Sequence, residues 1–413
     1  MLKTLVRLAV RNTTRKLART LFTAGMVVAG VALLVLGLTW IDGVTGQMLR
    51  EAGNISGHVR LVTRAYADRE ILAPLYENIP EIEPVEAMLL ARKGVIGVEP
   101  RIVTGGTVTV GEEIGDVFAR VVAARRSYFV DRVRADEKLQ EGRWFADDAD
   151  EVVVGHRVAE QLGAKVGQEI VLLGMTQYGS MSPIKGRLVG ITKRGSSILD
   201  GQVMVPLSKG QWLTDIPTGA TELLVYTDRY QDGPALGARL RASEIFQSNK
   251  YDISAWTERE PWASMMGSMK GVRGFVVFLI VLLTALGIWN TVMMSVLERR
   301  HEIGVLRAMG MARRSVVALF VGESLAIAGV GGLVGAALGS IPSWLLEKYG
   351  VHLGEQAVSA SEIPLSETMY GDLTLQVVMI AFGLGLVMAL VGSLVPAFRA
   401  ASVPPVTAMR SGR

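Results

Sequence analysis

Four long spans that are almost free of charge constrain the fold of this chain more than any other feature. Three of them contain no Asp, Glu, Lys or Arg, and the fourth contains one acid, Glu323. Each has at least about 20 residues, which as an α-helix rising about 1.5 Å per residue crosses a hydrocarbon core of roughly 30 Å. The spans are Thr20–Ile41, Gly274–Leu297, Ser315–Leu346 and Leu373–Phe398. The sequence therefore predicts a membrane protein with four transmembrane helices.

Composition predicts a soluble part beside these helices. The chain has 413 residues, of which 50% are hydrophobic and 20% are charged, too many charges for a purely membrane-embedded protein. There is no cysteine, so the soluble part must be stable without disulfides, and thiolate metal or redox sites are excluded. The first span is too long for the core of a signal peptide, and no small-residue cleavage site follows it. We therefore expect it to remain as a membrane helix.

Basic residues orient the spans. The segment before the first span carries six of them and no acid, the loop between the second and third spans is rich in arginine, and the loop after the third span is acidic. The positive-inside rule then places both termini in the cytoplasm and residues 42–272 and 347–372 outside. Lys3, Arg7, Arg11, Arg15 and Arg19 recur every four residues. This stripe is typical of an amphipathic helix on the cytoplasmic membrane surface, although a merely basic, topology-setting tail is the alternative.

The outside segment between the first two spans mixes strand-like and helix-like patterns, so we expect an α+β domain. Helical patterns fit His156–Leu162, ended by Gly163, and Pro234–Phe246, and a further helix is expected to begin after Pro84. The strand-like runs are His58–Thr63, Val117–Ala124, Glu151–Val154, Glu169–Leu173, Arg187–Ile191, Gln202–Val205 and Thr221–Tyr226. The four histidines, His58, His156, His301 and His352, lack metal-ligand spacing, and we expect a surface role for each and no metal site.

One loop of this domain, Gly174–Gly186, is long for a hairpin and carries Met175, Tyr178 and Met181. Loops of this length are uncommon unless they are functional or mobile. The pattern fits a protruding contact loop for a partner, or a flexible hairpin without a role.

The segment after the second span, VMMSVLERRHEIGVLRAMGM over 292–311, is dense in charge and is followed by another apolar span. It predicts a helix that continues from the second span to a stop at Gly310. Composition alone favours a solvated loop beside the membrane. The alternative is a docking helix through which a soluble partner transmits force. No GxxxxGK[ST], GxSxG or HExxH motif occurs, so the energy for any work must come from another protein.

The third span carries two unusual features. Gly331, Gly335 and Gly339 recur every four residues and predict a helix-packing seam, because small residues let helix backbones approach closely. Glu323 would cost about 2.5–3.5 kcal/mol if it faced lipid at mid-depth. We expect it to face protein or to lie near the cytoplasmic interface, and a proton-relay role has little support without partner residues.

The segments LERRHEIGVLRAMGM and FVGESLAIAGVGGLVGAALG resemble the FtsX-like permease domain of type VII ABC transporters, which include MacB-type exporters and the lipoprotein-releasing LolC/LolE permeases. LVPAFRAASVPPVTAMR resembles the C-terminal signature of the same family. GRWFADDADEVVVGHRVAEQLGAKVGQEIVLL resembles its periplasmic core domain. The chain lacks a fused ATPase, and the Gly174–Gly186 loop lies where LolC-type permeases place the hook that recruits a periplasmic carrier. The resemblance is therefore strongest to the LolC/LolE branch.

The resemblance implies a bacterial inner-membrane permease that works as a homo- or heterodimer with a dimeric cytoplasmic ABC ATPase. ATP and Mg would bind to that ATPase, this chain would bind no cofactor, and no nucleic acid is implied. Residues matching the ATPase-coupling helix are Glu298, Arg299, Arg300, Glu302, Ile303, Gly304, Arg307, Ala308 and Gly310. The implied segments are an amphipathic helix over 1–19, transmembrane helices over 20–41, 273–297, 315–346 and 373–398, a periplasmic domain over 42–272, a coupling helix over 298–314, a periplasmic loop over 347–372 and a cytoplasmic tail over 399–413.

The implied activity is extraction of lipoproteins from the outer leaflet of the inner membrane and their transfer to a periplasmic carrier. Met26, Val27, Phe275 and Phe278 are candidates for the extraction site, or are ordinary lipid-facing side chains. Met175, Tyr178, Met181 and Pro183 are candidates for carrier contact, a match by position and length more than by sequence. The alternatives are a MacB-like exporter of peptides or drugs with a periplasmic adaptor, and an FtsX-like regulator of a cell-wall hydrolase.

Overall fold

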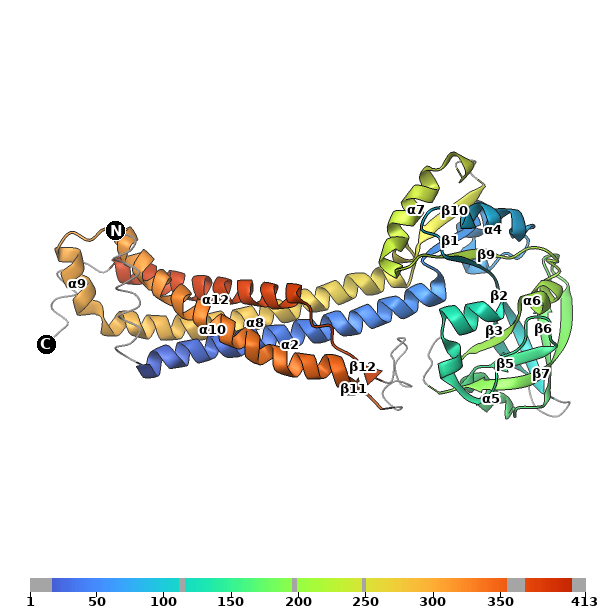
Figure 1. The fold of residues 1–413 in the computed structure, drawn as a ribbon, viewed down its shortest axis with the longest axis horizontal. Helices are drawn as coiled ribbons and strands as arrows, with labels where there is room; N and C mark the ends of the chain where they lie inside the picture. Colours follow the sequence, from blue (N-terminus) through green and yellow to red (C-terminus); the bar gives the residue numbers. More distant parts are fainter. Residues whose placement is uncertain (1–16, 111–115, 195–198, 247–249, 355–367, 403–413) are drawn as a thin grey trace. The chain divides into compact units, whose positions relative to one another are not determined.

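The computed structural model describes residues 17–110, 116–194, 199–246, 250–354 and 368–402 (Figure 1). The predicted amphipathic helix over 1–19 and the predicted tail over 399–413 fall largely outside the described residues. The chain divides into two compact units. The helical unit comprises the described parts of Met1–Gly46, Ser268–Val351 and Tyr370–Arg413, and the sheet unit comprises those of Gln47–Gly267 and His352–Met369.

Among the described residues, four helices are long and apolar enough to cross a membrane. They are α2 (Leu17–Ser56), α8 (Trp262–Glu298), α10 (Arg313–Tyr349) and α12 (Leu375–Ser402). The first two are longer than the uncharged spans: α2 continues past Ile41, and α8 begins at Trp262. Charge limits the part of a helix that can lie in lipid, but it does not end the helix, because the backbone hydrogen bonds continue in water.

Apolar side chains from all four long helices and a short fifth one form the core of the helical unit. Val31 and Leu34 of α2, Ile288 of α8 and Ala381 of α12 are fully buried in it. Small residues bring the helices close together: a Cβ on Gly392 of α12 would lie 2.6 Å from the carbonyl oxygen of Ala285 in α8. Close backbone approach is a common way to pack helices that share an apolar solvent.

The sheet unit contains a mixed ten-stranded sheet. Its path is β10-β1-β9-β2-β3-β8-β5-β7-β4, and β6 pairs with β2 and β7. The β3–β8 and β5–β7 pairs are parallel, and the others are antiparallel. The strands are β1 (Val59–Thr63), β2 (Gly97–Val110), β3 (Val117–Ala124), β4 (Leu139–Gly142), β5 (Glu151–Val154), β6 (Glu169–Met175), β7 (Met181–Thr192), β8 (Gln202–Pro206), β9 (Glu222–Tyr226) and β10 (Tyr251–Ala255).

Helices and short turns complete the sheet unit. A separate two-stranded pair consists of β11 (Val351–His352) and β12 (Thr368–Met369). The α-helices are α3 (Arg64–Asp68), α4 (Ile82–Leu90), α5 (His156–Leu162), α6 (Leu207–Thr214) and α7 (Gly233–Ala242). The predicted helix over His156–Leu162 coincides with α5, and Gly163 ends it with a φ of +60°. The helix expected after Pro84 begins earlier, at Ile82, because proline is well tolerated in a first helical turn.

His58 corrects the expectation that each histidine lies at the surface. It is 5% exposed, its Nδ1 accepts a hydrogen bond of 3.0 Å from the Thr227 N–H, and its ring stands edge-on to Tyr226. Burial, reinforced by the nearby positive charge of Arg132, lowers the pKa of His58 to about 4. The neutral imidazole can therefore pack beside the Tyr226 ring. The sequence did not predict this because His58 and Tyr226 are far apart in the chain.

Candidate functional site

The charge-dense segment after α8 forms a separate short helix, α9 (Arg300–Ala308). Ile303 is 6% exposed and belongs to the core of the helical unit, and Gly304 beside it is buried. Arg300, Glu302 and Val305 are exposed. The helix is therefore amphipathic: one side packs on the bundle and the other is open to a partner.

The predicted continuous helix from the second span to Gly310 is wrong in one respect. The α-helix ends at Glu298, and Arg299 is a turn residue with φ −95° and ψ 13° before α9 begins. The predicted stop is present: Gly310 has a φ of +92°. The Met311 N–H donates to the Leu306 carbonyl at 3.0 Å, and the Gly310 N–H donates to the Arg307 carbonyl at 3.1 Å. These two bonds form a Schellman motif, which fixes the end of α9.

Two arginines tie α9 and its preceding turn to the bundle. Arg299 Nη1 donates to Glu323 Oε2 of α10 at 3.0 Å, and both side chains are 14% exposed. Arg307 Nη1 donates to the carbonyl oxygen of Ala401 near the end of α12 at 3.0 Å. The helix is thus anchored to two different long helices, and a displacement of α9 must move or break these contacts.

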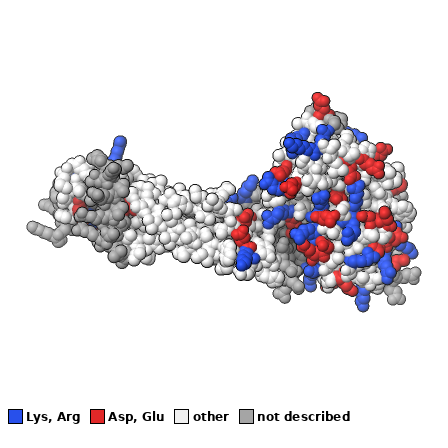
Figure 2. Space-filling model, viewed as in Figure 1, with Lys and Arg blue, Asp and Glu red and all other residues white. Residues whose placement is uncertain are grey.

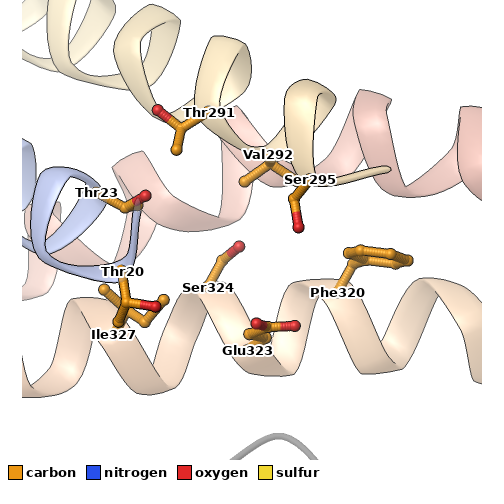
Figure 3. A pocket seen from close by; sticks show the side chains of 9 residues that line it. All are labelled: Thr20, Thr23, Thr291, Val292, Ser295, Phe320, Glu323, Ser324 and Ile327. Carbon is orange, nitrogen blue, oxygen red and sulfur yellow. The ribbon is translucent and has the colours of Figure 1, made fainter. Parts of the chain in front are cut away.

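Glu323 also lines a small polar cavity of about 40 Å³ between α2, α8 and α10 (Figure 3). The hydroxyls of Thr20, Thr291, Ser295 and Ser324 are among its lining groups. A cavity of this size and polarity has room for a water molecule, which needs roughly 10–15 Å³. Glu323, for which the sequence predicted no partner, is thus paired with Arg299 and lies beside several hydroxyl groups.

The nine residues predicted for ATPase coupling separate into two groups in the structure. Arg299, Ile303, Gly304 and Arg307 are buried or bonded within the chain, so they hold the helix in place. Those on the exposed side are Glu298, Arg300, Glu302, Ala308 and Gly310. Neither the Arg299–Glu323 pair nor the Arg307 bond was predicted, since each depends on the direction in which α9 folds back.

The three seam glycines of α10 all face α2. A Cβ on Gly335 would lie 2.6 Å from the carbonyl oxygen of Val28, and one on Gly339 would lie 2.7 Å from that of Ala32. For Gly331 the corresponding distance to Ala24 O is 3.2 Å. All three glycines are buried. The regular spacing of glycines on α10 thus follows the regular spacing of backbone carbonyls on α2.

The four extraction candidates do not lie together. Val27 is 1% exposed in the helical core, so it cannot line an open site in this conformation. Met26 faces α8, where its sulfur would lie 2.5 Å from a Cβ on Gly287. Phe275 and Phe278 of α8 are 64% and 60% exposed. Sequence hydrophobicity cannot separate these cases, since core and lipid-facing residues of a membrane helix are equally apolar.

The expected long loop over Gly174–Gly186 is mostly a β-hairpin. β6 and β7 pair continuously from Glu169↔Arg187 to Met175↔Met181, and residues 176–180 form the turn. Pro183 lies in β7 opposite Leu173. Met175, Tyr178 and Met181 are 52%, 79% and 56% exposed, so the end of the hairpin presents apolar side chains to solvent. The segment is therefore paired backbone over most of its length, and only residues 176–180 lie outside the strands.

Charge is distributed differently in the two units. Figure 2 shows acidic and basic side chains over the visible face of the sheet unit, whereas the helical unit is nearly uncharged along its spans. Within the described parts of the chain, no group of three or more His, Asp or Glu residues could hold a metal ion.

Two family models match the chain. The model described as the MacB-like periplasmic core domain matches residues 20–243, more than half of the chain, and the model described as the FtsX-like permease C-terminal domain matches residues 274–405. The first covers most of α2 and of the sheet unit, and the second covers α8 from Gly274 onward, α9, α10 and α12.

Individual proteins are also similar to the chain. An uncharacterized ABC transporter permease of Methanocaldococcus jannaschii is 29% identical over 233 residues, 54% of this chain and 55% of the relative, so the chain spans about half of that protein. The lipoprotein-releasing system transmembrane protein LolC of Neisseria meningitidis serogroup B is 23% identical over 412 residues, 95% of this chain and 94% of the relative. The crystal structure of the periplasmic region of MacB from Actinobacillus actinomycetemcomitans is 13% identical, covering 54% of this chain and 98% of that one with a TM-score of 0.36.

Proposed function

Because the chain belongs to the family of ABC transporter permeases that join a MacB-like periplasmic core domain to an FtsX-like permease domain, we propose that it relays the work of a separate cytoplasmic ABC ATPase to its periplasmic domain. In this proposal ATP and Mg bind to the ATPase dimer, and α9 is the surface on which that ATPase acts. Both termini and α9 lie in the cytoplasm, consistent with the arginine-rich sequence around α9.

The observation that carries the proposal is the two-sided nature of α9. Its inner side is anchored by the buried Ile303 and by the Arg307 bond to Ala401. Its outer side exposes Arg300 and Glu302. A helix that transmits force must be accessible to its partner on one side and attached to the membrane helices on the other. A helix that merely connects α8 to α10 needs no such attachment.

The test compares charge reversals at two exposed acids. Glu302→Lys alters the outer side of α9 without touching its anchors, and Glu141→Lys alters an exposed acid of β4 in the sheet unit. Each variant is purified with its native ATPase and reconstituted in lipid nanodiscs, and ATPase retention and ATP-dependent cargo release are measured. We expect Glu302→Lys to lose both and Glu141→Lys to keep both. Full ATP-dependent release by Glu302→Lys would show that α9 is not the coupling surface.

For the cargo, we propose lipoproteins extracted from the outer leaflet of the bacterial inner membrane. The full-length alignment with a protein named for lipoprotein release supports this choice. Phe275 and Phe278, exposed on α8, remain the extraction candidates, with Met26 at the α2–α8 contact. The test measures release of a radiolabelled lipoprotein from proteoliposomes. Phe278→Asp should impair release, and Leu375→Asp, which alters another exposed apolar residue on α12, should not.

A second permease subunit, identical or paralogous, is proposed to pack along α8. In the most apolar 18-residue stretch of α8, only 17% of the residues are buried within the chain, whereas the share is 33–39% in the other three long helices. An incompletely covered helix of this kind fits a subunit interface flanked by lipid. Crosslinking between two copies carrying Leu283→Cys, which alters a 61% exposed residue of α8, tests it in this naturally cysteine-free chain.

The end of the β6–β7 hairpin is proposed to recruit a periplasmic lipoprotein carrier. Its exposed Met175, Tyr178 and Met181 provide apolar contact area on a rigid support. Deleting Gly174–Gly186 would remove much of two paired strands, so Tyr178→Ser is the sharper variant. We expect it to abolish carrier capture and to leave ATP hydrolysis unchanged.

The MacB-like domain keeps one alternative open, an exporter of peptides or drugs with a periplasmic adaptor. The FtsX-like domain keeps another, a regulator of a cell-wall hydrolase. Mass spectrometry of proteins and lipids bound to the complex separates the three, because lipoprotein, adaptor and hydrolase are different partners.

A further inference from the structure

A cavity of about 420 Å³ opens in the sheet unit, and none of its lining residues belongs to the coupling, extraction or carrier-contact candidates described above. Its size is within the range of about 300–1,000 Å³ that small-molecule sites occupy. Four arginines line it, Arg60, Arg101, Arg120 and Arg259, together with only two acids, Glu70 and Glu222. The lining therefore carries an excess of positive charge.

The register of the sheet explains why these groups meet. Arg101 of β2 pairs with Glu222 of β9, and Gly105, four residues along β2, pairs with Arg120 of β3. Arg60 of β1 pairs with Leu224, two residues along β9 from Glu222. Residues opposite each other in an antiparallel pair, and residues two or four apart in a strand, share one face of the sheet. Arg60, Glu222, Arg101 and Arg120 thus project from the same face of four adjacent strands.

The two acids are already engaged by two of the arginines. Arg101 Nε donates to Glu222 Oε1 at 2.8 Å, and Arg60 holds Glu70 through two bonds of 2.5 and 2.7 Å. Burial alone would raise the pKa of Glu222, but Arg101, Arg60 and Arg259 together lower it to about 2. Both carboxylates therefore remain ionised and paired at neutral pH.

Arg120 and Arg259 are left over. Among the described residues, neither forms an ion pair with a carboxylate, and the side chain of Arg259 donates through Nη1 to the carbonyl oxygen of Ser56 at 3.0 Å. Burial and the neighbouring positive charge of Arg60 lower the pKa of Arg259 to about 10. In addition, Nε of the 4% exposed Arg60 is buried without a hydrogen-bond partner. Unsatisfied buried donors are costly, and a bound acceptor removes that cost.

Apolar side chains stand beside this cationic lining. Phe118 lines the cavity and is 78% exposed, and its ring lies where Gly105 leaves room, since a Cβ there would approach the ring to 2.5 Å. Ile71 and Leu72 follow the cavity residue Glu70 directly and are 100% and 75% exposed. Ile71 and Leu72 lie in the chain between the lining residues Glu70 and Ala73, so the segments that form the cavity carry three large exposed apolar groups.

We propose that this cavity binds an anionic amphiphile, with a phosphate group on Arg120 and Arg259 and an apolar chain over Phe118, Ile71 and Leu72. Arginine is suited to this task because its planar fork donates two parallel hydrogen bonds to phosphate oxygens. The Glu222 and Glu70 pairs hold the remaining arginines in place. The same phosphate chemistry is offered by a lipid headgroup or by free phosphate, and the apolar rim favours the lipid.

The test uses the full chain in nanodiscs of phosphatidylcholine. Dihexanoyl phosphatidic acid, below its micelle concentration, and inorganic phosphate are titrated separately by isothermal calorimetry. We expect saturable binding of the lipid that is tighter than that of phosphate. Arg120→Gln should weaken both by roughly tenfold or more, since it removes a charge-assisted hydrogen bond. Arg120 is exposed, so this variant is expected to fold.

Two further variants make the outcome decisive. Phe118→Ala should weaken the lipid alone, and Arg157→Gln, which changes an exposed arginine of α5 outside the cavity, should change neither affinity. Equal affinities for the two probes, unaffected by Phe118→Ala, would overturn the amphiphile in favour of free phosphate. Binding of neither probe, or equal binding by Arg120→Gln and Arg157→Gln, would overturn the site altogether.

Discussion

The ion pair between Arg299 and Glu323 connects the turn before α9 to α10, and its contribution to stability is measurable. Its N–O distance is 3.0 Å and each side chain is 14% exposed. Removing one partner of a buried pair typically costs about 3–5 kcal/mol, because the other charge is left buried and alone. Residual exposure places Arg299→Gln and Glu323→Gln near the lower limit, about 3 kcal/mol each.

The double variant is expected to cost far less than the sum of the single ones. With both charges gone, no isolated charge remains, and we expect Arg299→Gln/Glu323→Gln to lose about 3 kcal/mol in total. The double-mutant cycle then yields a coupling energy of about 3 kcal/mol. The measurement is equilibrium unfolding in mixed detergent micelles, followed by tryptophan fluorescence.

A second pair in the helical unit supplies the control. Arg273 and Asp42 lie 3.2 Å apart, but their side chains are 41% and 27% exposed. Solvent screening should reduce their coupling energy to about 1 kcal/mol or less. If the Arg299–Glu323 cycle were additive to within about 0.5 kcal/mol, or no larger than the Arg273–Asp42 cycle, the proposed anchoring of α9 through Glu323 would be refuted.

Three other predictions test separate features. Gly335→Ala should destabilise the helical unit by about 1–3 kcal/mol because its Cβ meets Val28 O, whereas Gly329→Ala, with nothing within 4 Å, should be neutral or slightly stabilising; equal unfolding midpoints would contradict the seam. Burial lowers the pKa of His58 to about 4 from an ordinary value of 6.5, so the neutral ring stabilises the fold above pH 6.5 and this contribution is lost as pH falls toward 4. From pH 7.5 to 5.5 the free energy of unfolding should fall by about 1 kcal/mol in wild type and in His156→Gln, but not in His58→Gln. In intact cells with a permeabilised outer membrane, a membrane-impermeant maleimide should label Ile71→Cys but reach Met309→Cys only after lysis, and the reverse order would overturn the proposed orientation.

Local patterns in the sequence predicted much of the fold where one element decides its own conformation. The strands over Val117–Ala124 and Glu151–Val154 coincide with β3 and β5 because β-branched residues and flanking turn residues act locally. The longest strand, β2, was missed. It contains Pro100, Gly105 and Gly106, which locally indicate turns. Three neighbouring strands, β9, β3 and β6, supply the hydrogen bonds that hold it extended.

Functional groups were harder to predict because charges meet through tertiary register. Arg101 and Glu222 are 121 residues apart in sequence, and they form a buried pair only because β2 and β9 align them. A shift of either strand by one residue would turn one of the two side chains to the other face of the sheet. The same holds for Glu323, a costly residue in an apolar span whose partner depends on the turn at Arg299.

This dependence also separates the two kinds of residue on α9. The motif LERRHEIGVLRAMGM identifies the helix. The sequence alone does not show which arginine binds another helix of the bundle and which is exposed for contact with a partner. Arg307 donates to Ala401 O and Arg300 is exposed, although both are basic residues of one short helix. Reversing the charge of Arg307 would therefore disturb the bundle as well as any docking, and a loss of function would not identify its cause. Glu302 does not take part in these anchoring bonds, so its reversal leaves them in place and reports more directly on the partner surface.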